Sequence, residues 1–189
     1  MSPKPIIRLL QHLARSGGTI ISKCLASMES IMLLSEIHPK GFQADPNPKF
    51  NPFYQASKWL NLLGPQEITL DQNQDNELFV KGLDFINQRC IEQNKILIIR
   101  DWSHLDYTCL PFDLSPCYYS QLEEALEDKF QIIKTATVRH PIFQYKSLLT
   151  FEPTLKENLL PELFIKGYLE FAKKAHKTGF VKYEDFCSN

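Results

Sequence analysis

The chain of 189 residues is 43% apolar and 23% charged, which excludes a disordered or collagen-like protein and predicts one globular domain over 1–189. A chain of this length buries roughly 70% of its unfolded surface, so it needs neither disulfides nor a structural metal to fold. Its 21 basic and 22 acidic residues nearly cancel, which excludes a general binder of nucleic acid or anionic membranes and requires any anion site to be local.

Apolar runs of strand length alternate with helical patterns, which is typical of βαβ units around a parallel sheet. In chain order we expect a strand over 6–13, a helix over 19–28, a strand over 31–34, a helix over 76–93, a strand over 95–100, a helix over 120–128, a strand over 130–138, helices over 141–150 and 159–176, and a strand over 180–183. The fold class is therefore α/β, with three layers (α/β/α) and a mostly parallel central sheet of about five strands.

Between the second strand and the first long helix, residues 40–75 are rich in proline, asparagine and aromatic side chains. This composition predicts a loop-rich excursion over a binding site, with a short helix near 54–63. A surface loop that packs its own aromatic residues is the alternative interpretation.

The first turn of the chain, Arg15-Ser16-Gly17-Gly18-Thr19, predicts an anion site. It lies between a buried strand and a helix, so its backbone N–H groups meet at a helix amino terminus, where the dipole favours phosphate or sulfate. It is not a Walker A loop, because threonine and not lysine follows the second glycine. Arg15 precedes the glycines and is placed to reach an oxygen of the anion. A glycine turn without a ligand is the alternative.

A second group of polar residues follows the predicted strand over 130–138. Arg139 comes at the carboxyl end of this strand, Pro141 suits the first turn of the next helix, and Ser147 lies two turns along it. Arg139 and Ser147 together predict a second phosphate site. An arginine paired with a carboxylate and a serine on a helix surface are the structural alternatives.

These motifs together resemble the PAPS-dependent sulfotransferases over nearly the whole chain. The shared features are an R-S-G-x-T loop, an acidic residue after the second strand, an arginine with a serine eight residues later, and a Tyr-Glu-Asp sequence at 183–185. The resemblance implies a P-loop nucleoside-triphosphate-hydrolase-like fold and sulfuryl transfer from 3′-phosphoadenosine 5′-phosphosulfate (PAPS) to a hydroxyl or amine. It assigns residues 15–19 to the 5′-phosphosulfate, Arg139 and Ser147 to the 3′-phosphate, and Tyr183 to the neighbourhood of the adenine.

Sulfuryl transfer resembles phosphoryl transfer in its loose, in-line transition state, so positive charge and positioning do most of the work. We expect Arg15 and the loop amides to stabilise the departing phosphate without a metal. The histidines form no H-x-x-x-H or H-E-x-x-H motif, which predicts that the protein has no metal centre.

The acceptor must lose a proton, which requires a general base. Glu36 is the first candidate, because a carboxylate at the end of a strand beside the phosphate loop lies where open α/β sheets bind ligands. The resemblance supports Glu36 through the carbohydrate and protein-tyrosine sulfotransferases, and it supports His104 through the cytosolic ones. His38 is the third candidate. Asp101 or Arg100 would instead help to bind the acceptor.

Two other functions stay open. A P-loop nucleotide kinase-type phosphotransferase would need a lysine after the glycines and a magnesium carboxylate, neither of which the sequence offers. A truncated, non-catalytic sulfotransferase-like binding module would fit the end of the chain at Asn189, soon after the Tyr-Glu-Asp sequence. The acceptor class is a small molecule, a carbohydrate or a peptide.

The cysteines and the amino terminus predict a cytoplasmic protein without a membrane anchor. Five cysteines are an odd number without a C-x-x-C pair, which fits neither a disulfide framework nor a zinc knuckle. Residues 6–13 are too short and too interrupted by charge for a signal peptide or a spanning helix.

Overall fold

The computed structural model describes residues 3–41, 72–109, 115–151 and 160–188. Most of the predicted excursion over 40–75, and the whole short helix expected near 54–63, lie outside the described residues. Within the described ranges, no helix is both long and apolar enough to cross a membrane.

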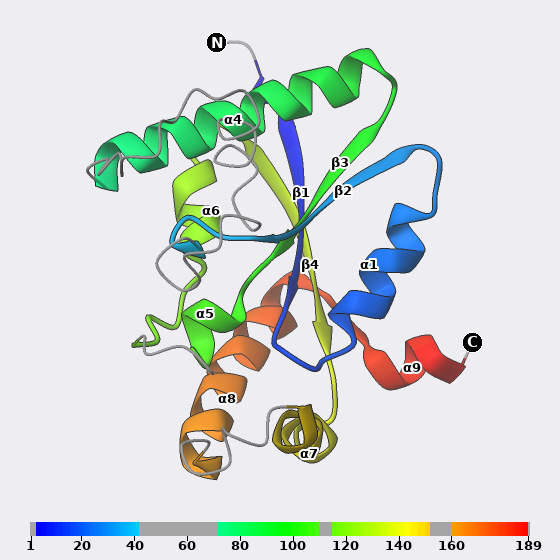
Figure 1. Ribbon diagram of the computed structural model, residues 1–189, viewed down its shortest axis with the longest axis vertical. Coiled ribbons are helices and arrows are strands. Elements are labelled where there is room, and N and C mark those ends of the chain that lie inside the picture. The colour runs from blue at the N-terminus through cyan, green and yellow to red at the C-terminus, as the bar shows by residue number, and fades with distance from the viewer. Residues whose placement is uncertain (1–2, 42–71, 110–114, 152–159, 189) are drawn as a thin grey trace, which may run out of the picture.

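Five parallel strands form the central sheet, in the order β2-β3-β1-β4-β5 (Figure 1). Their bounds are β1 (Ile6–His12), β2 (Ile31–Ile37), β3 (Ile96–Asp101), β4 (Gln131–Val138) and β5 (Phe180–Lys182). Because all strands run in one direction, their carboxyl ends meet at one edge of the sheet. This arrangement confirms the predicted α/β class and the expected number of strands.

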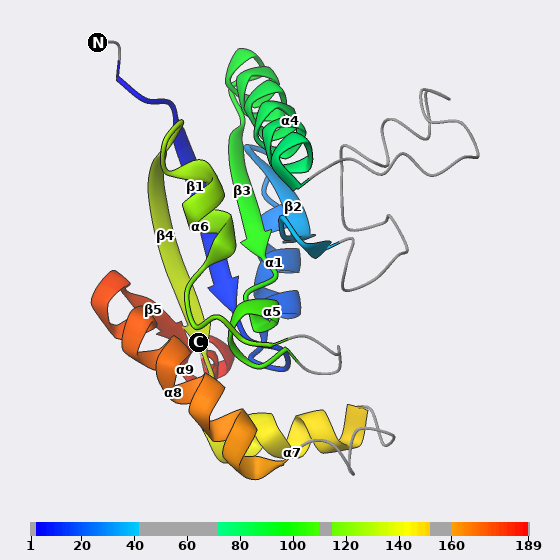
Figure 2. The ribbon, with the colours of Figure 1, turned by 90° about the vertical axis from the view of Figure 1, so that its left-hand side faces the viewer.

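Helices cover both faces of the sheet. Their bounds are α1 (Gly18–Ala26), α4 (Gln72–Glu92), α5 (His104–Tyr107), α6 (Gln121–Leu126), α7 (Pro141–Phe151), α8 (Pro161–Thr178) and α9 (Tyr183–Ser188). In Figure 1, α6 and α8 lie on one side of the sheet, and α1 and α9 lie on the other. Figure 2 shows the turn between β1 and α1, together with α5 and α7, beyond the carboxyl ends of the strands.

The main core lies between the sheet and the layer that contains α4 and α6. Alternate residues of β1, Ile7 and Leu9, point to this face and pack in one cluster with Leu83 of α4 and Leu122 of α6. The same strand is also buried at Leu10, on its other face. Burial on both faces also accounts for the unbroken aliphatic run over 96–99 in the neighbouring strand β3.

The structure departs from the sequence prediction mainly at the ends of elements. Two helices, α5 and α9, were not expected, because four to six residues are too few for a helical period to be read. Tyr183 consequently begins α9 and does not end the last strand. In α8, Phe164 and Phe171 are buried, whereas Leu163 is exposed.

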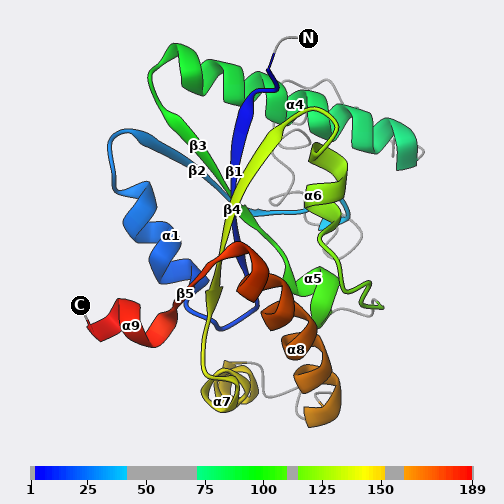
Figure 3. The same cartoon turned by 180° about the vertical axis from the view of Figure 1, so that it is seen from behind.

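The last strand and helix bring residues 180–188 close to the turn that follows β1. In Figure 3, β5 carries the chain from α8 to α9, which lies near α1. The β4–β5 pairing fixes this return, with Ala136 opposite Phe180 and Val138 opposite Lys182. The predicted anion turn and the Tyr-Glu-Asp sequence are therefore neighbours in space.

Candidate functional site

The turn between β1 and α1 is held in a fixed shape by left-handed backbone and by Ser16. Arg15 has a φ of 64° and Gly17, the N-cap of α1, a φ of 88°. The Ser16 hydroxyl donates to the Leu13 carbonyl at 2.8 Å and lies 3.3 Å from the Thr137 hydroxyl. Ser16 is 1% exposed, so its side chain shapes the turn from inside and leaves only its backbone for a ligand.

Both glycines of this turn are required by close packing. A Cβ on Gly17 would lie 2.0 Å from Cδ2 of Tyr183, and one on Gly18 would lie 2.3 Å from Cδ2 of His12. The glycines therefore let the turn approach β1 and α9 closely. The first N–H groups of α1 have no acceptor within their own helix, which leaves them available to an anion.

The two predicted phosphate sites meet. Arg15 donates from Nε to the Ser147 hydroxyl at 2.9 Å, and Arg139 donates from Nη1 to the Arg15 carbonyl at 3.1 Å. The Arg15 guanidinium also lies 4.6 Å from the centre of the Phe151 ring. Contacts over more than 120 residues of sequence thus bring the residues of both sites into one group.

Arg139 is fixed from several sides. Its guanidinium lies 4.9 Å from the centre of the Tyr183 ring, and its carbonyl accepts a hydrogen bond from the Tyr168 hydroxyl at 3.0 Å. The next residue, His140, donates its N–H to Glu184 at 3.0 Å. Within the described ranges, Nε of Arg139 is buried and has no hydrogen-bond acceptor. One donor of this cation is thus left to bind an acceptor such as a phosphate oxygen.

Glu36 lies in a bulge of β2. Leu34 pairs with Ile99 and Ile37 with Asp101, so β2 advances three residues while β3 advances two. The extra residue gives Glu36 a φ of 59°, an outlier for a residue with a long side chain. Such a backbone conformation costs of the order of 1–2 kcal/mol and persists only where the surrounding structure holds it.

Arg100, at the end of β3, connects Glu36 to the anion turn. Its Nη2 lies 3.3 Å from Oε1 of Glu36 and donates to the Thr19 hydroxyl at 3.1 Å. Its other groups donate to Nε2 of His12 and to the Ser35 hydroxyl, each at 3.0 Å. Burial lowers the pKa of Arg100, and the Glu36 carboxylate opposes this shift. Arg100 therefore contacts both the Glu36 carboxylate and the anion turn.

The two histidine candidates differ from Glu36 in their surroundings. His104 is buried, and desolvation, with His38 and Arg100 nearby, lowers its pKa to about 3. His38 is also buried and uses both ring nitrogens: Nδ1 accepts from the Lys40 N–H at 3.0 Å, and Nε2 lies 3.1 Å from Asp106. Glu36, which is 30% exposed at its side chain, is the most accessible of the three.

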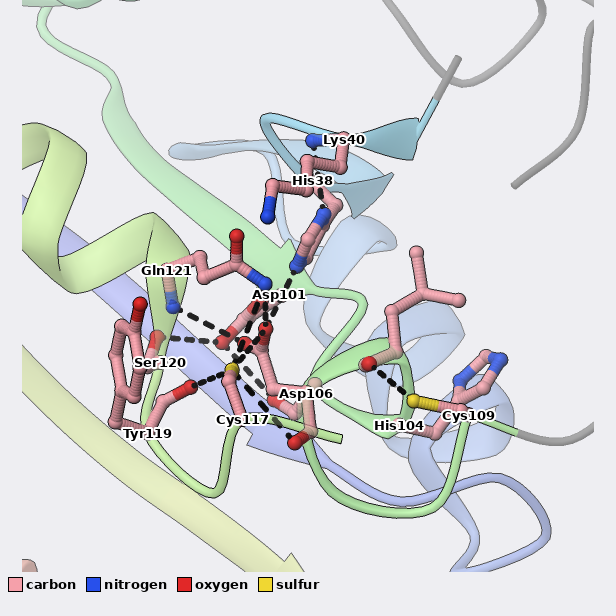
Figure 4. Close-up of polar contacts among 12 residues, drawn as sticks. His38, Lys40, Asp101, His104, Asp106, Cys109, Cys117, Tyr119, Ser120 and Gln121 are labelled. Atoms are coloured by element: carbon pink, nitrogen blue, oxygen red, sulfur yellow. Dashed lines mark hydrogen bonds and ion pairs between the residues drawn. The ribbon is translucent and has the colours of Figure 1, made fainter. Parts of the chain in front are cut away.

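Asp101 was considered for binding the acceptor, but its side chain is fully buried and is therefore not accessible to one. Figure 4 shows its polar surroundings. Its Oδ2 accepts hydrogen bonds from Ser103, Gln11 and Ser120 at 2.9 to 3.2 Å. Burial, with Asp106 close by, raises its pKa to about 6. Among the described residues, no group of three or more histidines, cysteines or acidic residues is arranged to hold a metal ion.

Comparison with known proteins supports the fold. No protein-family model and no curated protein matches the sequence. The sulfotransferase domain from the curacin biosynthetic pathway superimposes with a TM-score of 0.60 and 16% identity, covering 100% of this chain and 70% of that one. The sulfotransferase domain from the Synechococcus PCC 7002 olefin synthase gives 0.54 and 16%, covering 97% and 68%. The chain therefore has a P-loop-like α/β fold of the kind found in sulfotransferase domains.

Sequence reasoning missed three residues that contact the arginines of this candidate site. His12 and Tyr168, which hold Arg100 and Arg139, looked like ordinary strand and helix residues. Phe151, whose ring lies against the Arg15 guanidinium, follows the predicted helix over 141–150. Of the three, only His12 carried a usable signal, because a histidine at the end of a strand beside an anion turn is a candidate for contact with the site.

Proposed function

We propose that this protein binds PAPS and transfers its sulfuryl group to a hydroxyl or amine acceptor. The observation that carries the proposal is the junction of Arg15, Arg139 and Ser147 beside the amino terminus of α1. A nucleotide with phosphates on both its 5′ and 3′ positions needs two anion sites at a short separation. The likeness to two sulfotransferase domains supports the same cofactor through the shared fold.

The residues present fit such a nucleotide. The buried, unbonded Nε of Arg139 and the Ser147 hydroxyl would hold the 3′-phosphate, and the amides of Gly17, Gly18 and Thr19 would hold the 5′ side. When bound, the cofactor supplies the sulfuryl group. Tyr183, which lies against Gly17 and Arg139, would border the nucleotide between the two sites.

Glu36 is proposed as the general base and Arg100 as the cation of the transfer site. The Glu36 carboxylate would accept the proton of the acceptor group. Arg100, bonded to Thr19 and paired with Glu36, would then keep positive charge next to the turn. His104 is buried, whereas the Glu36 side chain is 30% exposed, which favours Glu36 as the base. Arg15, expected from the sequence on the 5′-phosphosulfate side, is bonded to Ser147 and would instead add charge on the 3′-phosphate side.

The test is release of adenosine 3′,5′-bisphosphate from PAPS in the presence of a panel of phenols, alcohols, amines, sugars and tyrosine peptides. We expect acceptor-dependent release that Glu36→Gln lowers by about 100- to 10,000-fold. The matched control is Glu29→Gln, an exposed carboxylate before β2, which should leave the rate unchanged. Full activity of Glu36→Gln would remove Glu36 as the base. Magnesium-dependent transfer from ATP would replace the proposal with a phosphotransferase.

A further inference from the structure

The strained bulge of β2 is held at both ends. On the side before Glu36, Ser35 accepts a hydrogen bond from Arg100. On the side after it, the Ile37 carbonyl accepts a hydrogen bond from the Trp102 N–H at 3.2 Å. The next residue, His38, has a buried side chain. Because Glu36 adopts a left-handed backbone conformation, which is unfavourable for a residue with a Cβ, its position depends on these anchors.

The hydrogen bonds of His38 define which ring nitrogen carries the hydrogen. The Lys40 N–H donates to Nδ1 at 3.0 Å, so Nδ1 is the acceptor. Nε2 therefore carries the hydrogen and donates to Oδ1 of Asp106, 3.1 Å away. The ring orientation is thus fixed by one contact within its own loop and one contact to α5 (Figure 4).

Asp106 is itself held by a different part of the fold. It accepts hydrogen bonds from the backbone N–H of Gln121 at 3.1 Å and from the Gln121 side chain at 2.8 Å. Its own carbonyl accepts the N–H groups of Cys117 and Tyr118 at 3.0 and 2.9 Å. The His38 and Asp106 side chains are 1% and 0% exposed, so the pair joins the end of β2 to α6 through the protein interior.

We propose that His38 is a positioning residue that, through Asp106, holds the β2 bulge and so fixes the Glu36 carboxylate beside Arg100. The inference rests on the proposed function, in which Glu36 is the base. A pair of buried polar groups adds little net stability over apolar residues of similar volume, so its contribution here is to orientation. A catalytic group displaced by about 1 Å can lose roughly 100-fold in rate.

Two substitutions separate the two hydrogen bonds of His38. His38→Gln places an amide N–H near the position of Nε2 and keeps the donor to Asp106. His38→Asn places an oxygen near the position of Nδ1 and keeps only the acceptor for Lys40. We expect His38→Asn to lower kcat by roughly 10- to 100-fold and His38→Gln by less than about 3-fold, with the Kd for adenosine 3′,5′-bisphosphate unchanged in both.

A double-mutant cycle distinguishes positioning from a general structural defect. If His38 acts through Glu36, His38→Asn has no further effect on the rate of Glu36→Gln. An equal loss in both backgrounds, or equal rates for the Asn and Gln variants, would overturn the proposal. Asn87, a buried side chain that donates to the Ile6 carbonyl at the far end of β1, provides the control: Asn87→Ala should lower stability without changing kcat.

A measurement that needs no turnover tests the positioning separately from the proposed function. The NMR signals of the Glu36 amide and carboxyl carbon should shift more in His38→Asn than in His38→Gln, because both variants lose the ring current of His38 but only His38→Asn loses the hydrogen bond to Asp106. Equal shifts in the two variants would contradict the positioning role. Shifted signals in a protein that releases no bisphosphate from PAPS would support the positioning and contradict the sulfotransferase.

Discussion

Replacing Gly17 by alanine tests how closely the anion turn packs against the end of the chain. At a φ of 88°, a residue with a Cβ costs about 1–2 kcal/mol more than glycine. The new Cβ would also lie 2.0 Å from the Tyr183 ring, which must move. Moving the ring breaks its contact with Arg139, worth about 0.5–1 kcal/mol at a partly exposed site.

The expected total loss for Gly17→Ala is about 1.5–3 kcal/mol, which lowers the Tm by roughly 3–12 °C in a domain of this size. Thermal unfolding followed by circular dichroism measures it for the wild type, Gly17→Ala, Tyr183→Ala and the double variant. In the Tyr183→Ala background only the backbone cost should remain. Gly41→Ala is the control, because its Cβ would meet Trp102 at an ordinary 3.8 Å and should change the stability by less than about 0.5 kcal/mol. An equal loss with and without the Tyr183 ring would refute this packing.

Three further results are expected. Gly167→Ala should destabilise the protein by about 1–3 kcal/mol in urea unfolding, because its Cβ would lie 2.2 Å from the Tyr107 carbonyl oxygen; an unchanged midpoint would contradict this close contact. Asp101 has a folded pKa of about 6, so its burial lowers the stability of the protein as pH rises from about 4 to 7. The expected loss is on the order of 2–3 kcal/mol. Asp101→Asn should remove this pH dependence in urea titrations at several pH values. His104 has a folded pKa of about 3, so the wild type loses stability through this group as pH falls from about 6.5 toward 3. His104→Gln should lose less stability over this range in urea titrations at several pH values, and an equal loss in the two proteins would contradict this reasoning.

The sheet and the turn could be predicted from local patterns. β3 begins with the unbroken aliphatic run over 96–99 because both faces of the strand pack inside the protein, and a glycine turn followed by a helix is a local signal. The order of the strands and the bulge in β2 depend on pairing with β3, about 65 residues away, and no local pattern contains that information.

The sequence indicated which residues belong to the candidate site, but it did not indicate which of them contact one another. Arg139 and Ser147 were found from their spacing, but the bonds that join them to Arg15 depend on how α7 packs against the turn. Asp101 or Arg100 was expected to help bind the acceptor. Its contacts with Thr19 and Glu36 instead arise because β3 lies between β1 and β2 in the sheet.

The most direct measurement of the central proposal is calorimetric titration of the protein with adenosine 3′,5′-bisphosphate, with 5′-AMP and ATP plus magnesium in parallel. The account predicts that the bisphosphate binds at least about 10-fold more tightly than 5′-AMP, which corresponds to about 1.4 kcal/mol for the 3′-phosphate. Arg139→Ala should remove most of that difference while leaving the affinity for 5′-AMP nearly unchanged. Equal affinity for the two nucleotides, or a preference for ATP with magnesium, would contradict a PAPS site.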